Sequence, residues 1–209
     1  MQLVAGVDCS TQATKVLIVD PDDGSVVATG RFSHEVAGVG GARETDPSQW
    51  WDALSHALAQ AGRSAEVSAI SVGGQQHGLV ALGADGWPLR PALLWNDVRA
   101  AGEARTLVEA LGGPGVWADR IGLVPVASYT VSKWAWLRRN EPDVAKATVA
   151  VLLPHDFINT RLTGVRTTDR GDASGTGWWS SAGEEYSADV LSLSEVQLDA
   201  TMLPTVLGP

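Results

Sequence analysis

The sequence has few of the residues on which several classes of protein depend. It contains one cysteine, Cys9, which excludes an internal disulfide and fits a reducing compartment. Acidic residues outnumber basic ones, 24 to 15, and the net charge of −9 argues against a surface for nucleic acid or an anionic membrane. No apolar run approaches membrane-spanning length, and no basic segment followed by a long apolar stretch opens the chain. These absences predict a soluble, cytoplasmic protein with no nucleic-acid or membrane partner.

Phenylalanine and tyrosine are also scarce, with two of each, whereas tryptophan occurs nine times. Most of these indole rings are expected in the core, and an indole face can also stack on a sugar. With 209 residues, 44% of them hydrophobic, the chain can bury a full core. We therefore expect one domain over residues 1–209.

Two apolar runs near the N-terminus flank a small, hydroxyl-rich turn. Residues 3–7 and 15–20 are rich in β-branched side chains and too short for helices, so they predict a hairpin, and residues 25–29 predict a third strand. The turn carries Asp8, Ser10, Thr11 and Ala13, and the last three are small enough to let backbone N–H groups converge on an anion. Asp8 is placed to hold Mg²⁺ directly or through water. An ordinary polar turn is the alternative interpretation.

Helices and strands are expected to alternate after this meander. Asp46 as N-cap, Pro47 in the first turn and Gly62 as terminator predict a well-bounded helix. Further strands are predicted at 67–72, 79–82, 91–95 and 148–153, further helices at 96–111, 132–139 and 154–162, a helix end at 112–115, extended chain with turns at 167–179, and one or two short helices within 187–203. The expected fold is α/β: a three-stranded antiparallel meander extended into a mixed sheet with helices on both faces, as in ribonuclease H-like or actin-like ATPase domains.

Two polar stretches at the ends of predicted strands are candidates for ligand contact. Gln76 and His77 lie in a glycine-flanked turn, where the backbone can approach a ligand closely, although a lone turn histidine is often structural. Trp95, Asn96 and Asp97 combine an aromatic face with amide and carboxylate groups, which suits a polyol. A core tryptophan followed by a helix cap is the alternative for this stretch.

Five motifs, in this order, resemble those of the glycerol kinase and xylulokinase family of carbohydrate kinases. They are residues 6–15, 74–78, 91–97 with Arg99, 154–159, and 168–176 followed by Trp178, and the resemblance covers all 209 residues. It implies the N-terminal, sugar-binding half of an ATP-dependent kinase that transfers the γ-phosphoryl group of MgATP to the 5-hydroxyl of D-xylulose. In that family pattern Asp8 would assist at the metal and phosphates, and the nucleotide phosphates would be faced by Ser10, Thr11 and Gln12. The ketose would be touched by Gln76 and His77, and its binding groove would also be lined by Trp95, Asn96 and Asp97.

Two departures from the family pattern stand out. Ser10 occupies a position where the family usually has glycine, and the chain lacks the second, ATP-binding domain that supplies the catalytic base in the family. The isolated chain is therefore expected to be inactive. A kinase of another ketose or polyol, and a non-catalytic sugar-binding protein with the same fold, are the alternatives. A ribonuclease H-like nuclease is disfavoured by the negative charge, and the oligomeric state stays open between monomer and homodimer.

Overall fold

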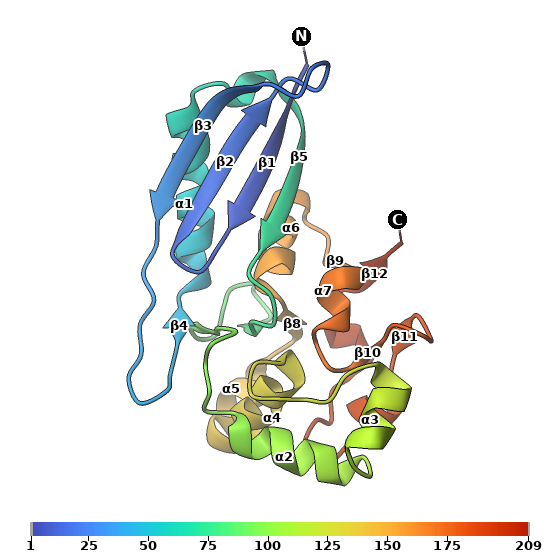
Figure 1. The fold of residues 1–209 in the computed structure, drawn as a ribbon. Helices are drawn as coiled ribbons and strands as arrows, with labels where there is room; N and C mark the ends of the chain where they lie inside the picture. The colour runs from blue at the N-terminus through green and yellow to red at the C-terminus, as the bar shows by residue number, and fades with distance from the viewer. Residues whose placement is uncertain (1, 209) are drawn as a thin grey trace.

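The structure is a computed structural model that describes residues 2–208, so the predicted domain is described without its two terminal residues. Figure 1 shows two regions joined end to end, a sheet with two helices next to the N-terminus and a helical region with short strands beyond it. Each region has its own cluster of buried apolar side chains, around Trp50 and Phe157 in the first and around Trp117 and Trp134 in the second. No helix among the described residues combines the length and the apolar character needed to cross a bilayer.

The first region is built on a mixed four-stranded sheet in the order β3-β2-β1-β5. Its strands are β1 (Leu3–Cys9), β2 (Ala13–Val19), β3 (Val26–Ser33) and β5 (Val67–Gly74). The first three are antiparallel neighbours, as predicted, and β5 pairs parallel to β1. The carboxyl ends of β1 and β5 therefore lie side by side and point toward the second region (Figure 1).

Helix α1 (Pro47–Ala61) lies across β2 and β3, and its ends are those predicted. The Asp46 side chain accepts a hydrogen bond from the Ser48 N–H, and Gly62 closes the helix with a φ of 74°. The close approach of α1 to β3 requires Gly30, because a Cβ there would lie 2.7 Å from the carbonyl carbon of Ala57. This contact fixes the helix on the sheet.

Helix α6 (Pro154–Thr163) packs beside α1 on the same face of the sheet, where Trp50 meets Phe157 edge to face at 6.3 Å. The mixed α/β fold is confirmed. The expected helices on the second face are not found among residues 2–208: there Gly6, Lys15 and Leu17 are exposed. The described residues thus cover one face of this sheet.

The second region contains short strands and several helices. They are β4 (Glu44–Thr45) paired with β7 (Ala92–Leu93), β6 (Val80–Leu82) with β8 (Ala150–Leu152), β9 (Thr167–Asp169) with β12 (Thr205–Leu207), β10 (Trp179–Ser180) with β11 (Glu185–Tyr186), the helices α2 (Ala101–Ala110), α3 (Pro114–Ile121), α4 (Thr130–Asn140), α5 (Pro142–Ala147), α7 (Arg170–Ser174) and α8 (Ala188–Leu191), and the 3₁₀ turn η2 (Ala200–Met202). The 3₁₀ turn η1 (Ser64–Glu66) belongs to the first region, where it connects α1 to β5. The β6–β8 ribbon joins the two regions, because alternate side chains of each strand belong to opposite core clusters.

Two local predictions for this region are wrong, and one helix was not predicted. The helix predicted from residue 96 begins at Ala101, because the Asp97 carboxylate binds Arg99 and the Arg43 N–H rather than capping a helix. The Gly112 to Gly115 run does end α2, but α3 starts within it, with Pro114 in its first turn. The segment predicted as extended over 167–179 contains the one-turn helix α7, which is capped by Asp169.

Candidate functional site

The predicted site residues meet at the carboxyl ends of the parallel strands β1 and β5. The turn after β1 carries Ser10 to Gln12, and the loop after β5 carries Gln76 and His77; the Gln75 N–H donates to the Cys9 carbonyl at 3.1 Å and joins the two segments. The carboxyl ends of parallel strands are where open α/β sheets bind ligands. The fold thus brings together segments that lie about sixty-five residues apart in the sequence.

Trp95 joins this group from a third segment, because its indole Nε1–H donates to the Thr11 hydroxyl at 3.1 Å. Trp95 is 45% exposed, so it is not the core tryptophan of the alternative interpretation. Its ring therefore bridges the predicted phosphate-binding turn and the predicted sugar groove. An exposed aromatic face in this position is available for stacking on a sugar.

The turn after β1 is held mainly by its own hydrogen bonds. The Ser10 hydroxyl donates to the Ala13 carbonyl at 2.8 Å, which shows how serine is accommodated at this position. Gln12 is exposed, and its carbonyl accepts from the His34 N–H at 3.1 Å. The Ser10 hydroxyl proton is thus used inside the turn, and the exposed side chain of Gln12 is left for contact with a ligand.

Asp8 lies at the end of β1 with its carboxylate 56% exposed, and Oδ2 is 3.0 Å from Lys15 Nζ. Exposed ion pairs of this kind contribute about 0–1 kcal/mol, so a divalent cation can replace the ammonium group at small cost. A hard carboxylate oxygen with room for water ligands is what Mg²⁺ prefers. Asp8 therefore fits the predicted role at a metal.

His77 has the most constrained geometry in the site. Its φ is 61°, a left-handed conformation uncommon outside glycine, and its Nδ1 lies 2.9 Å from the Gly175 carbonyl. Because a carbonyl only accepts, Nδ1 carries the hydrogen and Nε2 of the neutral ring keeps its lone pair. The ring of Tyr129 meets His77 edge to face at 4.9 Å. A Cβ on Gly175 would lie 2.5 Å from the same Nδ1, so this contact requires glycine.

The surroundings of His77 also keep its ring neutral. Burial lowers the pKa of His77 below its ordinary value of 6.5, the hydrogen bond to Gly175 opposes this, and the positive charge of Lys133 adds to the lowering. Near neutral pH the Nε2 atom is therefore an acceptor, able to receive a hydrogen bond from a hydroxyl group. This is the chemistry expected of a sugar-binding histidine.

Gln75 was not among the predicted site residues, and it is the buried member of its loop. Its side chain is 8% exposed and neither amide atom has a hydrogen-bond partner among the described residues, whereas the predicted Gln76 is exposed. Buried polar atoms are nearly always paired, so this amide calls for a ligand group or water. Its place beside Gly74 in the glycine-flanked turn was the available sequence signal.

Asn96 and Asp97 differ in whether their side-chain oxygens already accept hydrogen bonds. The Asn96 Oδ1 atom is buried without a partner among residues 2–208, which leaves it free for a ligand. The Asp97 carboxylate accepts from the Arg43 N–H at 2.8 Å and from Arg99 Nη2 at 2.6 Å. Burial raises the pKa of Asp97, but the bonds from Arg99 and Arg43 outweigh burial and hold it below its ordinary value. Asp97 thus stabilises the turn that presents Trp95, and its contact with a sugar stays a prediction.

Lys133 is a second residue that the sequence reasoning missed. It lies in α4, is 1% exposed, and its Nζ donates to the carbonyls of Ala127, at 3.2 Å, and Ser128. Burial lowers the pKa of Lys133 to about 7, against the opposing charge of Asp97. Its bonds hold the segment that leads into Tyr129, so Lys133 supports one wall around His77. Lysine is normally a surface residue, so its burial follows from packing that the local sequence does not reveal.

A cluster of ionisable side chains lies next to the loop that carries His77, at the start of α6 and in and just before α7. His155 Nδ1 is 3.2 Å from both Asp156 Oδ1 and Asp172 Oδ2, and His155 Nε2 is 3.9 Å from Asp169 Oδ2. His155, Asp169 and Asp172 each bring a ligand atom within 4.8 Å of the others, a spacing compatible with a cation. Burial raises the pKa of Asp172 to about 6, and the charge of His155 opposes this. Burial lowers the pKa of His155, but the bond to Asp156 and the nearby carboxylates outweigh it and raise the pKa.

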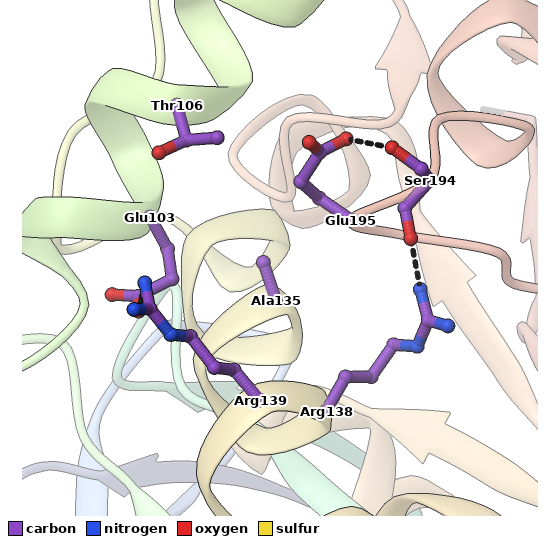
Figure 2. Close-up of a pocket in the computed structure, with 7 residues that line it drawn as sticks. All are labelled: Glu103, Thr106, Ala135, Arg138, Arg139, Ser194 and Glu195. Carbon is purple, nitrogen blue, oxygen red and sulfur yellow. Dashed lines mark hydrogen bonds and ion pairs between the residues drawn. The ribbon is translucent and has the colours of Figure 1, made fainter.

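A cavity of about 210 Å³ lies elsewhere, between α2, α4 and residues 194–195 (Figure 2). Its charged side chains are paired with groups in its own wall, since Arg138 donates to the Ser194 carbonyl at 2.8 Å and Arg139 lies 3.5 Å from Glu103. None of the predicted site residues lines it. The candidate site is therefore the group of residues at the carboxyl ends of β1 and β5, and not this cavity.

Comparison with known proteins gives a consistent result. Residues 3–208 match the model of the FGGY family of carbohydrate kinases, N-terminal domain. The xylulose kinase of Streptomyces coelicolor is 58% identical over 208 residues, which are 99% of this chain and 43% of that protein. Among solved structures, the xylulose kinase of Bifidobacterium adolescentis aligns with a TM-score of 0.88 at 38% identity, over 100% of this chain and 48% of that one.

The match to a glycerol kinase of Plasmodium falciparum, crystallised with ADP, shows the fold alone: the TM-score is 0.89 at 19% identity, over 99% of this chain and 43% of that one. In every one of these comparisons the chain spans less than half of the length of its relative. The similarity is thus to part of each of these proteins, and the matching family model is that of the N-terminal domain.

Proposed function

Because the chain belongs to the FGGY family of carbohydrate kinases, we propose that it forms the sugar-binding part of an ATP-dependent kinase that converts D-xylulose to D-xylulose 5-phosphate. The observation that carries the proposal is the convergence of His77, Trp95 and the turn after β1 at one edge of the sheet. A sugar held there lies next to the turn proposed to face the nucleotide phosphates. The single cysteine and the use of MgATP favour the cytoplasm as its location.

The ketose is proposed to bind between His77 and Trp95. The Nε2 lone pair of His77 accepts a hydrogen bond from one hydroxyl, and the exposed face of Trp95 packs on the carbon skeleton. The unpaired atoms of Gln75 and Asn96 supply further polar partners, which hydroxyl groups can satisfy. Together these groups orient the acceptor hydroxyl, and positioning is the main contribution that kinases make to rate.

The nucleotide phosphates are proposed to lie at the turn that contains Ser10, Thr11 and Gln12. Asp8, beside this turn, would hold Mg²⁺ directly or through water, and the bound ion would neutralise charge on the transferring phosphoryl group. Exposure of the Asp8 carboxylate at the end of β1 supports this assignment. The base that removes the hydroxyl proton is proposed to lie outside residues 1–209. The Asp172 carboxylate, near the Gly175 that binds His77, is paired with His155 instead.

Calorimetric titration of the chain with D-xylulose tests the proposal, with other ketoses and glycerol as competitors for the same site. Replacing His77 with alanine is expected to weaken binding by about 1–3 kcal/mol, because a ligand hydroxyl loses its partner. His56→Ala, on the exposed side of α1, is the matched control and is expected to bind as the parent does. Unchanged affinity in folded His77→Ala protein, or a clear preference for glycerol, would contradict the proposal.

A further inference from the structure

His77 is held by contacts that lead back to the first turn of α6, which contains His155. The loop that carries His77 begins at Gly74, where a Cβ would lie 3.2 Å from the backbone and Cβ of His155. The same loop ends at Gly78, where a Cβ would lie 2.6 Å from the ring of Pro154. Both ends of the loop therefore rest directly on the first turn of α6.

The other support of His77 comes from α7. The Gly175 carbonyl that binds His77 Nδ1 belongs to the residue that ends this helix, and the Gly175 N–H donates to the Asp172 carbonyl at 3.1 Å. The Asp172 side chain in turn lies 3.2 Å from His155 Nδ1. Contacts thus run from the His155 ring through Asp172 and Gly175 to the ring of His77.

The pair of His155 and Asp172 is well suited to hold this arrangement in place. The side chains are 9% and 11% exposed, respectively, and His155 is the side-chain partner that the described residues provide for the Asp172 carboxylate. Buried charges are costly when unpaired, so separation of the two groups is disfavoured. Helix α7 has a single turn, and an anchor of this kind sets where its last carbonyl points.

We propose that His155 and Asp172 are positioning residues for ketose binding, which act by fixing the Gly175 carbonyl on His77 and so its Nδ1–H tautomer. This inference rests on the proposed sugar-binding role of His77. It assigns the two residues no contact with the sugar. Their effect is to keep Nε2 as the acceptor that faces a hydroxyl, instead of allowing the ring to exchange its proton between the two nitrogens.

The experiment combines xylulose calorimetry with NMR of the histidine ring nitrogens in the 209-residue chain. The chain has four histidines, so two-bond ¹H–¹⁵N spectra are simple, and the His77→Ala spectrum identifies the His77 signals. The variants are Asp172→Ala, Asp172→Asn, His155→Ala and the double alanine variant. His56→Ala and Asp189→Ala, at exposed positions, are matched controls.

In the parent chain His77 is expected to show a protonated Nδ1 and an unprotonated Nε2. Either alanine variant should average these signals and weaken xylulose binding roughly tenfold, the effect of about one lost hydrogen bond. The double variant should bind no more weakly than either single one, because the pair acts as a unit. Asp172→Asn, which keeps the shape and a carbonyl acceptor, should lie between parent and Asp172→Ala.

Three results would overturn the inference. The first is that His77 signals and affinity stay unchanged in folded variants, and the second is weakened binding with an unaltered His77 tautomer. The third is an additive loss in the double variant, which would refute action as a pair. If the parent chain binds no ketose, the proposed function fails, yet averaged His77 signals in the variants would still support the positioning role. The two hypotheses therefore fail separately.

Discussion

Replacing Gly175 with alanine tests the centre of the proposed site with one methyl group. Gly175 has a φ of −85°, which alanine adopts freely, so the backbone is not strained by the change. The new Cβ would lie 2.5 Å from His77 Nδ1, about 1 Å inside ordinary contact, and the ring must move. Any effect of the variant therefore arises from this one contact.

The expected magnitude has two parts. Overpacking of a close contact costs about 1–3 kcal/mol, and displacement of the ring removes a hydrogen bond with a net value of about 1 kcal/mol. We expect the free energy of unfolding of Gly175→Ala to fall by roughly 1–3 kcal/mol and its affinity for D-xylulose to fall about tenfold or more. Urea unfolding measures the first quantity and calorimetry the second.

Gly102→Ala is the matched control, because Gly102 lies in α2 with no atom within 4 Å of the position of an added Cβ. Alanine there is expected to be neutral or to stabilise the helix by about 0.5–1 kcal/mol. If Gly175→Ala binds xylulose as tightly as Gly102→Ala does, the contact between Gly175 and His77 does not shape the sugar site, and the reasoning fails.

Three further predictions concern the remaining groups. In a complete kinase, Asp8→Asn should lower turnover about 100-fold or more while changing sugar affinity little, because Asp8 acts on metal and phosphate charge. The pKa of Lys133 is lowered from 10.5 to about 7, so between these pH values the unfolded chain binds a proton that the folded chain has lost. The free energy of unfolding of the parent should therefore rise between pH 7 and 10, and Lys133→Met should abolish this rise. The isolated chain should show no measurable xylulose phosphorylation in a coupled ADP assay, since a base is proposed to lie outside residues 1–209 and its loss alone costs about 10²–10⁴ in rate.

Each of these has a defined contrary outcome. Near-normal turnover of Asp8→Asn would return Asp8 to the status of a turn residue. Parallel stability curves of parent and Lys133→Met across this pH range would show that the buried ammonium does not titrate differently on unfolding. Sugar-dependent ADP release by the isolated chain, free of host kinase, would place a catalytic base within residues 1–209 and direct attention to Asp169 and Asp172.

The sequence predicted best those features that local chemistry determines. The meander, the capped ends of α1 at Asp46 and Gly62, and the strand β5 follow from alternation, capping and turn residues, whereas the parallel pairing of β5 with β1 was not predicted. The start of α2 was mispredicted because the carboxylate of Asp97, a normal capping residue, is drawn to Arg99 instead. A competing tertiary partner of this kind leaves no trace in local spacing.

The same limit explains what was missed in the candidate site. The contact between His77 and Gly175 joins residues 98 apart, and that between Trp95 and Thr11 joins residues 84 apart. Periodicity identifies the elements that carry these residues but not the rotation of each side chain within them. Lys133 reads as a surface residue by type, and only packing of α4 against the segment 127–129 reveals that its ammonium group is buried.

The physical basis of the site is the neutral state of one imidazole ring. In water a histidine ring can adopt either neutral tautomer or bind a proton. In this protein burial and the charge of Lys133 keep the His77 ring neutral, and the Gly175 carbonyl selects the tautomer with the hydrogen on Nδ1. A ketose presents several hydroxyl groups, each both donor and acceptor, so a ring with a single fixed acceptor selects the orientation in which a hydroxyl donates to Nε2. The orientation of a sugar bound as proposed would thus depend on residues at the starts of α4 and α6 and the end of α7, which lie far from His77 in the sequence.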